Sequence, residues 1–177
     1  MGKLIATTQA TLDGVVDPVG EWVQPDGDHG EHSFERQARS AGLVLGRKTY
    51  EGLASYWPSR SGKWADMVNS LPKYVGSGTL TGDLAWNATA LEGELDDAVA
   101  KLKSAVEGDL FMHGSGEFAY ALAARGLVDV FEIYLNPLVW GEANLHVLGE
   151  RGTVRMALEE VKRFDSGVVL LTYLPAS

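Results

Sequence analysis

The sequence predicts an α/β fold whose central sheet is mixed but mostly parallel and carries helices on both faces. Through the middle of the chain, short apolar runs alternate with segments of helical spacing, which is typical of parallel strands joined by helices. Near the C-terminus, two alternating runs at 154–164 and 168–174 meet at Asp165-Ser166-Gly167, which indicates a β-hairpin at one edge of the sheet. We find no internal repeat or linker, so residues 1–177 are expected to form a single domain.

Strands are expected where short apolar runs are bounded by turn residues, and helices where apolar residues recur every three or four positions. The expected strands cover 3–8, 43–45, 74–76, 84–87, 110–112, 130–135 and 145–148, followed by the hairpin. The expected helices lie around 31–40, from about Thr49 to Tyr56, within 65–71, over 96–106 and over 117–125. Between Asp17 and Gly30 the composition changes to Pro, Gly, Asp and Trp, which predicts a long loop.

Composition and charge narrow the possible partners. The chain has 177 residues, 45% of them hydrophobic, and no apolar run near the roughly 20 residues that span a membrane. It also lacks an N-terminal signal pattern, so we expect a soluble, cytoplasmic protein. The absence of cysteine excludes disulfides, thiolate metal sites and a cysteine nucleophile. A formal charge of −9 argues against general binding to nucleic acid, whose phosphates need clustered Lys and Arg.

A glycine loop follows the apolar run at 110–112. Gly114-Ser115-Gly116 lies between that expected strand and a helix beginning at Glu117. Free backbone N–H groups at such a junction bind anions. The functional interpretation is a site for a dinucleotide pyrophosphate, and the alternative is a tight turn that needs glycine for backbone reasons alone.

Two further expected strands end in residues suited to phosphate. Gly46-Arg47-Lys48-Thr49 follows the strand at 43–45 and puts two cations and a hydroxyl at a strand-to-helix junction. The alternative there is a surface Arg-Lys pair with Thr49 as the N-cap. Ser77-Gly78-Thr79 follows the strand at 74–76. Because ligands of open α/β sheets bind beyond the carboxyl ends of the strands, the convergence of three such segments predicts a nucleotide site.

The glycine loop also matches, formally, the G-x-G-x-x-[GA] fingerprint of Rossmann domains, from Gly114 to Ala119. A Rossmann domain needs a second βαβ half and an acid at the end of the next strand. Here the strand at 130–135 is followed by Asn136-Pro137 without an acid, and too little chain remains for a second half. We therefore reject the Rossmann fold.

Five motifs together resemble those of a known family. They are LIATTQATLDGVV, LVLGRKTYEGL, KYVGSGTL, LFMHGSGEFAYAL and PLVWGEA. Their combination resembles the three-layer dihydrofolate-reductase-like fold. Within it, the chain looks closest to stand-alone relatives of the reductase domain of the bifunctional riboflavin-biosynthesis deaminase-reductase. The resemblance covers nearly the whole chain and implies a mixed sheet flanked by helices, NADPH as the hydride donor and a flat heterocyclic substrate.

The resemblance also implies which residues hold the cofactor. Arg47, Lys48 and Thr49, after Gly46, would bind its phosphates, and Ser77 would lie near the ribose 2′-phosphate and adenine. The pyrophosphate would lie against the glycine loop and the start of the next helix: Gly114, Ser115, Gly116, Glu117 and Phe118. Ala6 lies on the strand that borders the nicotinamide in such enzymes. The only clustered polar set suited to a 2′-phosphate is Arg47, Lys48 and Ser77, so NADPH is expected to bind better than NADH.

Two departures from the family pattern concern the chemistry. The family's glycine pair is Gly114-Ser115 here, and a serine narrows the freedom of the backbone. Folate reductases place a carboxylate on the helix after the Trp-containing loop, where this chain has Gly30. Asp28 and Glu31 are the best candidates to assist protonation instead, although each also fits a solvated charge near a helix start.

Other side chains have both a functional and a structural interpretation. His113, beside the glycine loop, is predicted to contact the cofactor, or else to be a buried structural histidine. Asp28-His29 and Glu31-His32 could suggest a metal site, but no third segment supplies ligands, so we predict none.

Three aromatic residues fit either the wall of a flat-ligand pocket or ordinary packing: Trp22, Tyr56 and Trp57. No nucleophile elbow or Ser-His-Asp order appears, which leaves a hydrolase with little support.

Two hypotheses therefore follow from the sequence. The first is an NADPH-dependent reductase of a pterin-like or aminopyrimidine compound, such as 5-amino-6-(5-phosphoribosylamino)uracil. The second is an NADP(H)-binding protein without turnover that acts as a sensor or scaffold. We retain this hypothesis because the chain has Gly30 where folate reductases have an acid. The resemblance also suggests a homodimer.

Overall fold

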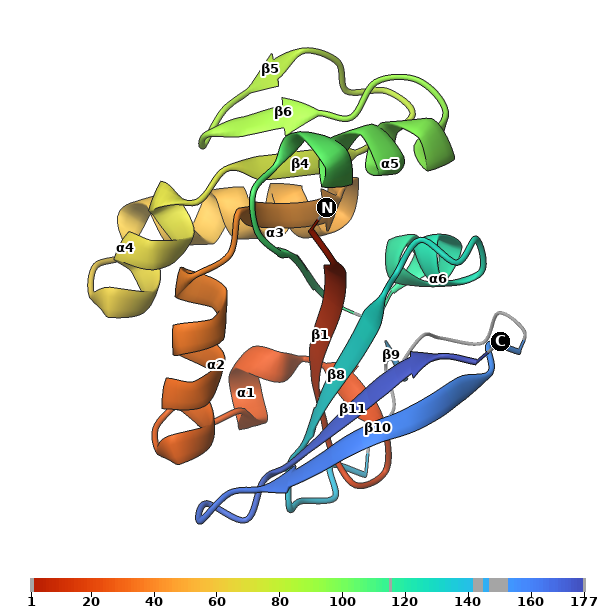
Figure 1. Cartoon of the computed structure of the whole chain (residues 1–177). Helices are drawn as coiled ribbons and strands as arrows, with labels where there is room; N and C mark the ends of the chain where they lie inside the picture. Colours follow the sequence, from red (N-terminus) through yellow and green to blue (C-terminus); the bar gives the residue numbers. More distant parts are fainter. Residues whose placement is uncertain (1, 115, 142–144, 147–152, 177) are drawn as a thin grey trace.

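The computed structural model describes residues 2–114, 116–141, 145–146 and 153–176. Nine of the strands form one twisted sheet in the order β10-β11-β8-β1-β7-β3-β4-β6-β5 (Figure 1). Its parallel part consists of β1 (Leu4–Ala10), β3 (Gly42–Gly46), β4 (Lys73–Gly76), β6 (Ala88–Ala90), β7 (Leu110–His113) and β8 (Val130–Leu135). The carboxyl ends of these strands therefore point toward one edge of the sheet.

Antiparallel strands form both edges of the sheet. β10 (Met156–Arg163) and β11 (Val169–Pro175) form the C-terminal hairpin, and β11 pairs with β8. β5 (Asp83–Leu84) pairs with β6 at the opposite end. A separate two-stranded sheet joins β2 (Val15–Asp17) to β9 (Leu145–His146).

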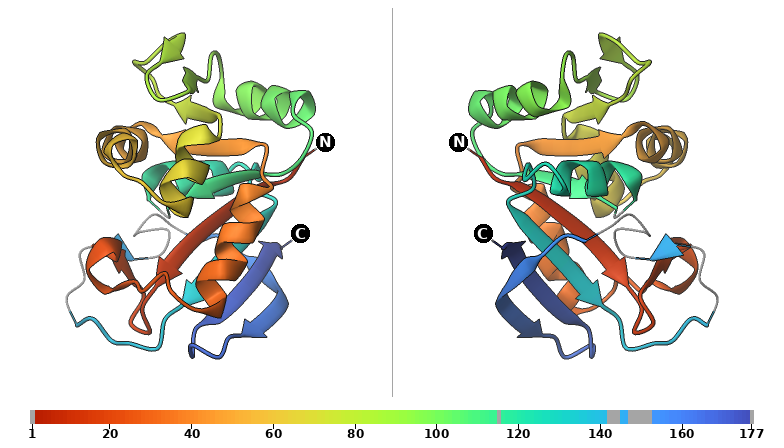
Figure 2. Two further views of the ribbon diagram at one scale, coloured as in Figure 1. Left: turned by 90° about the vertical axis from the view of Figure 1, so that its left-hand side faces the viewer. Right: turned by 90° about the vertical axis from the view of Figure 1, so that its right-hand side faces the viewer.

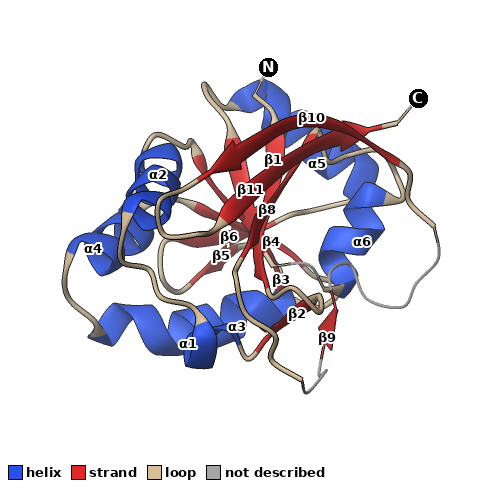
Figure 3. Ribbon diagram, turned by 90° about the horizontal axis from the view of Figure 1, so that it is seen from below, coloured by secondary structure: helices blue, strands red, loops and turns tan. Residues whose placement is uncertain are grey.

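Helices cover both faces of the sheet (Figures 1 and 2). One face carries α2 (Asp28–Ala38), α3 (Arg47–Tyr56) and α4 (Lys63–Ser70), with a short 3-10 turn at Trp57–Ser59. The other carries α5 (Leu95–Ala105) and α6 (Glu117–Ala123), and Figure 3 shows the strands running between the two groups. The four-residue α1 (Val19–Trp22) precedes α2.

Two apolar clusters hold these layers together, one on each face. Because side chains alternate along a strand, Leu4 of β1 packs toward α5 and α6, whereas its neighbour Ile5 packs toward α3 and α4. Leu122 of α6 and Val68 of α4 are buried in the respective clusters. The central strands, covered on both faces, are apolar throughout, which is the pattern that the sequence shows at 43–45 and 110–112.

The predicted fold class is confirmed, including the C-terminal hairpin, but three local expectations are wrong. The segment 17–30 is not a continuous loop, since it contains α1 and the beginning of α2 at Asp28. The helix expected from Thr49 begins at Arg47, and Gly46 rather than Thr49 is its N-cap.

The third error is the strand expected at 84–87, where a tight turn separates β5 from β6. Trp86 and Asn87 have φ angles of 64° and 50°, a left-handed pair that suits a hairpin turn but is uncommon for a tryptophan. Tertiary contacts hold this turn in place: Trp86 Nε1 donates to Asn69 Oδ1 at 2.7 Å, and Lys73 Nζ lies 4.1 Å from the Trp86 ring centroid. The apolar character of the segment therefore reflects docking on α4, not strand pairing.

Over the described residues, the longest helices, α2 and α5, have 11 residues each, and none is long and apolar enough to cross a membrane.

Candidate functional site

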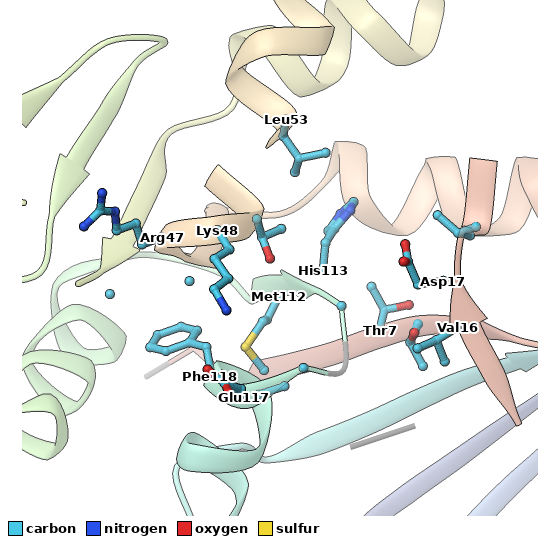
Figure 4. A pocket seen from close by; sticks show the side chains of 18 of the residues that line it. Thr7, Val16, Asp17, Arg47, Lys48, Leu53, Met112, His113, Glu117 and Phe118 are labelled. Carbon is cyan, nitrogen blue, oxygen red and sulfur yellow. The ribbon is translucent and has the colours of Figure 1, made fainter. Parts of the chain in front are cut away.

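A cavity of about 960 Å³ opens where the carboxyl ends of β1, β3, β4 and β7 meet. Figure 4 shows Arg47, Lys48, Glu117 and Phe118 on one side of this cavity. Thr7, Val16 and Asp17 lie on the other side, with Met112 and His113 between the two groups. The three strand ends singled out in the sequence therefore meet around one cavity, as the rule for open α/β sheets predicts.

Arg47 links two of these strand ends. Its Nη1 donates to Thr79 Oγ1 at 2.7 Å, and its Nε donates to Glu51 Oε1, also at 2.7 Å. Ser77 Oγ accepts from the backbone N–H groups of Thr79 and Leu80, both at 3.1 Å, and so holds the loop after β4. Arg47 is half-exposed and sits in the first turn of α3, so a cation and the positive helix end lie together at this side of the cavity.

Phe118 explains why β3 and β4 both end in glycine. A Cβ on Gly46 would lie 2.7 Å from Phe118 Cβ, and one on Gly76 would lie 2.3 Å from two atoms of its ring. Gly46 and Gly76 are register partners, so the ring packs across the ends of both strands. Gly46 was predicted as a phosphate-binding glycine, and the structure gives it a packing role as well. No atom of the described residues lies within 4 Å of a Cβ built on Gly114, whose φ is 97°, or on Gly116.

His113 presents a buried nitrogen at the wall of the cavity. Its Nε2 is shielded from solvent and has no hydrogen-bond partner in the part of the chain that the structure describes. Burial lowers the pKa of His113 to about 4, so the imidazole is neutral near pH 7. Buried polar atoms are normally paired, and an unpaired one beside a cavity is a candidate for contact with a ligand.

Most of the residues predicted to bind the cofactor line this one cavity: Gly46, Arg47, Lys48, Thr49, Ser77, His113, Gly114, Gly116, Glu117 and Phe118. Ala6 does not line it, because its side chain is 6% exposed and packs into the core, whereas Thr7, Thr8 and Gln9 at the end of β1 do. Ser115 lies outside the described residues.

The structure does not bring Asp28 and Glu31 to the cavity. Asp28 Oδ2 accepts from the backbone N–H of Asp165 at 2.7 Å, and this hydrogen bond lowers the pKa of Asp28 below its usual value. Asp28 thus holds the turn of the β10–β11 hairpin. Glu31 forms an ion pair with Lys63 at the surface. Neither lines the cavity, and their part in protonation stays a prediction.

The structure also places the histidines and aromatic residues that had both a functional and a structural interpretation. His29 holds the same hairpin turn, with Nδ1 2.9 Å from Ser166 Oγ. Among the described residues, no group of three His, Asp or Glu side chains could hold a metal ion. Trp22, Tyr56 and Trp57 do not line the cavity, whereas Trp64 of α4 does.

The sequence reasoning missed the contribution of α2. Ser33 and Gln37 line the cavity and are 7% and 4% exposed. They follow Gly30 by three and seven positions, so the three lie on one face of the helix. A Cβ on Gly30 would lie 1.7 Å from the carbonyl oxygen of Pro25, which leaves no room for an acid there. Small and polar residues at helical spacing, Gly30, Ser33 and Gln37, were the signal available in the sequence.

Fold and site together define an α/β protein with the architecture of dihydrofolate reductase. The structure matches dihydrofolate reductase from Enterococcus faecalis complexed with NADP(H) with a TM-score of 0.60 and 16% identity, over 99% of this chain and 98% of that one. It matches a Shewanella sp. PV-4 protein provisionally assigned to riboflavin biosynthesis with a TM-score of 0.74 and 20% identity, over 99% of both chains. The dihydrofolate-reductase-like fold expected from the motifs is confirmed.

The chain belongs to the RibD C-terminal domain family, whose model matches residues 2–170. This is the family of the RibD reductase domain, so the chain belongs to an oxidoreductase class. The uncharacterised protein YyaP of Bacillus subtilis (strain 168) is 25% identical over 179 residues, covering 97% of this chain and 94% of YyaP. The predicted relationship to stand-alone RibD-type reductase domains is confirmed.

Proposed function

We propose that this protein is an NADPH-dependent reductase that transfers hydride to a small flat heterocycle, an aminopyrimidine or a pterin-like compound. The observation that carries the proposal is the single cavity that joins three strand ends, with Arg47 at one side and the polar face of α2 among its walls. Such a cavity has room for an extended dinucleotide beside a second, smaller ligand.

The residues present fit NADPH. Arg47, Ser77 and Thr79 already form a hydrogen-bonded set that offers a guanidinium and hydroxyls to a ribose 2′-phosphate, with Lys48 beside them. Open space at Gly78, Gly114 and Gly116 lets phosphate approach the backbone closely. When bound, the cofactor supplies a hydride from its nicotinamide ring.

The remaining residues orient the reactants. Thr7 and Thr8 at the end of β1 and Met112 at the end of β7 form adjacent walls, because β1 and β7 are neighbours in the sheet. A neutral His113 can accept or donate one hydrogen bond there without placing a charge beside the nicotinamide. Asp17 lines the same cavity, on the side opposite Arg47 in Figure 4, and is a third candidate carboxylate for protonation beside the predicted Asp28 and Glu31.

Fluorescence titration with NADPH and NADH tests the cofactor assignment. We expect NADPH to bind at least about tenfold more tightly in the native protein, because a charge-assisted contact to phosphate contributes roughly 1.5–3 kcal/mol. Arg47→Ala should remove most of this preference while Arg39→Ala, on the exposed surface of α2, keeps it. Equal affinities in the native protein would overturn the assignment of the 2′-phosphate site.

A second candidate is a protein that binds NADP(H) without turnover. The closed packing of Gly30 against Pro25 favours it, since the position where folate reductases carry an acid has no room for one. NADPH oxidation measured across dihydropterins, quinones and 5-amino-6-(5-phosphoribosylamino)uracil separates the two candidates. Oxidation with any of these substrates supports the reductase, and tight NADPH binding without oxidation across the panel supports the sensor.

We also propose that the protein acts in the cytoplasm as a homodimer. Support for the dimer comes from β10, which forms an edge of the sheet and exposes Leu158 and Val161 by 54% and 55%. An antiparallel pair of β10 strands centred on Val161 would set Glu160 opposite Lys162 and Glu159 opposite Arg163. Opposite charges at facing positions stabilise such pairs.

A further inference from the structure

The wall of the cavity formed by α2 contains a buried amide with one unused atom. Gln37 is 4% exposed and lines the cavity. Its Nε2 donates to Ser33 Oγ at 2.9 Å, while its Oε1 is shielded from solvent and has no hydrogen-bond partner among the described residues. Buried carbonyl oxygens in native proteins are nearly always paired, because an unpaired one loses its hydration without compensation. Because Gln37 lines the cavity, its unpaired Oε1 is a candidate acceptor for a donor on a ligand.

A chain of hydrogen bonds fixes which atom of the Gln37 amide is left unpaired. The phenol of Tyr134, which is 1% exposed, lies 3.1 Å from His32 Nδ1 and is also hydrogen-bonded to the Ser33 side chain. With the Nδ1 atom of neutral His32 as acceptor, Tyr134 donates to His32 and Ser33 donates to Tyr134. Ser33 Oγ then accepts from Gln37 Nε2, as observed, and Oε1 is left for a ligand.

The surroundings of His32 favour this arrangement of donors and acceptors. Burial lowers the pKa of His32 below its usual value, and the cations Lys162 and Arg36 lower it further. The carboxylates Glu160 and Glu35 oppose that effect without reversing it. Phe164 packs on the His32 ring with centroids 5.3 Å apart and so holds it against Tyr134. The imidazole is therefore neutral near pH 7 and available as an acceptor.

We propose that Gln37 is a specificity-determining residue whose Oε1 accepts a hydrogen bond from a ring N–H of the substrate, an imide or lactam N–H of a flat heterocycle. The proposal rests on the proposed reductase function, which it deepens by naming the edge of the substrate that the protein reads. A neutral amide oxygen is a suitable acceptor for a neutral N–H. The carboxylate that folate reductases carry has no room at Gly30 in this protein. Ser33 and Tyr134 act as positioning residues that hold the amide in this orientation.

The test compares the binding of two probes, 5,6-diaminouracil and its 1,3-dimethyl derivative, in which both ring N–H groups are replaced. Calorimetric titrations are run with and without NADP⁺. We expect the native protein to prefer the unmethylated probe by about tenfold or more, the range for a buried hydrogen bond. Gln37→Met keeps the volume but removes the acceptor, and it should reduce the preference to less than about threefold.

Two further variants show whether the preference comes from the acceptor itself. Gln37→Glu keeps an acceptor and should retain the preference. Gln24→Met is the matched control, because the Gln24 side chain is exposed and does not line the cavity. Its preference should equal that of the native protein. Thermal melts confirm that each variant is folded.

Three results would overturn the proposal: equal binding of the two probes by the native protein, no binding of either probe, or an unchanged preference in folded Gln37→Met. The proposed reductase function has its own test, the NADPH titration, and it fails if the native protein does not bind NADPH. Because the probe titrations are also run without cofactor, their outcome stands in either case.

Discussion

Packing of Phe118 against the glycines that end β3 and β4 gives a quantitative prediction. In Gly76→Ala, the new Cβ would lie 2.3 Å from Phe118 Cε2 and Cζ, about 1.1 Å inside ordinary contact at 3.4 Å. The ring must move or the strand end must shift, and overpacking of this kind costs about 1–3 kcal/mol. For a domain of this size, a loss of about 2 kcal/mol lowers the Tm by roughly 4–8 °C. Because the displaced ring borders the cavity, the affinity for NADPH should also fall.

The control lies two residues away. Gly78→Ala adds the same methyl group just after β4, where no described atom is within 4 Å and φ is not positive, so its effect on the unfolding free energy should stay within about 0.5 kcal/mol. Urea denaturation of both variants, repeated in a Phe118→Ala background, isolates the clash. In the Phe118→Ala background, the loss of unfolding free energy caused by Gly76→Ala should be at least about 1 kcal/mol smaller than in the native background. Equal costs for the two glycine variants, or a Gly76→Ala cost that persists without the ring, would refute the packing argument.

Three further predictions concern titration and assembly. The pKa of His113 is about 4 in the folded protein against 6.5 for a free histidine, so the unfolded chain binds more protons between these values. Folding stability should therefore fall as the pH drops from 6.5 to 4, by up to roughly 3 kcal/mol. This pH-dependent part of the unfolding free energy should vanish in His113→Asn, as measured by urea denaturation at each pH. If the unfolding free energies of the native protein and of His113→Asn change with pH in parallel, the prediction is contradicted. Protonation of His32 makes Nδ1 a donor, which reverses the hydrogen-bond chain to Gln37. The preference for the unmethylated probe should therefore shrink as the pH falls through the lowered pKa of His32, but not in His32→Gln. Finally, Lys162→Glu places like charges opposite Glu160 across the proposed β10 pair, so it should shift sedimentation toward the monomer, with Glu160→Lys restoring the dimer. A monomeric native protein would remove the basis for this prediction.

The predictable part of the fold follows from local patterns. Apolar runs such as 43–45 and 110–112 indicate strands covered on both faces, and their alternation with helical spacing indicates a parallel sheet. Parallel strands end at the same edge, so the sequence alone placed Gly46–Thr49, Ser77–Thr79 and the loop at 114–116 around one ligand site. The cavity lined by the described members of these segments agrees with that inference.

Distant contacts decide what neighbouring residues in the sequence cannot show. Asp28 is a candidate acid because it lies near the position of the missing carboxylate, and that role stays a prediction. The structure uses it to hold the backbone of Asp165, which is 137 positions away in sequence. Trp86 looked like part of a strand, but its contacts with Asn69 and Lys73 stabilise a left-handed turn instead. Neither partner can be identified from neighbouring residues, because each depends on how separate elements pack.

By itself, then, the sequence determined the sheet, its parallel strand ends and the residues predicted to bind phosphate at one side of the cavity, because those properties depend on periodicity and on residues close in sequence. Only the tertiary structure decided which face of α2 closes the cavity. That choice depends on the rotation of the helix about its axis, which the packing of Gly30 against Pro25 sets by leaving no space for a side chain. The same rotation brings Ser33 and Gln37 to the cavity wall, with Tyr134 and His32 behind them.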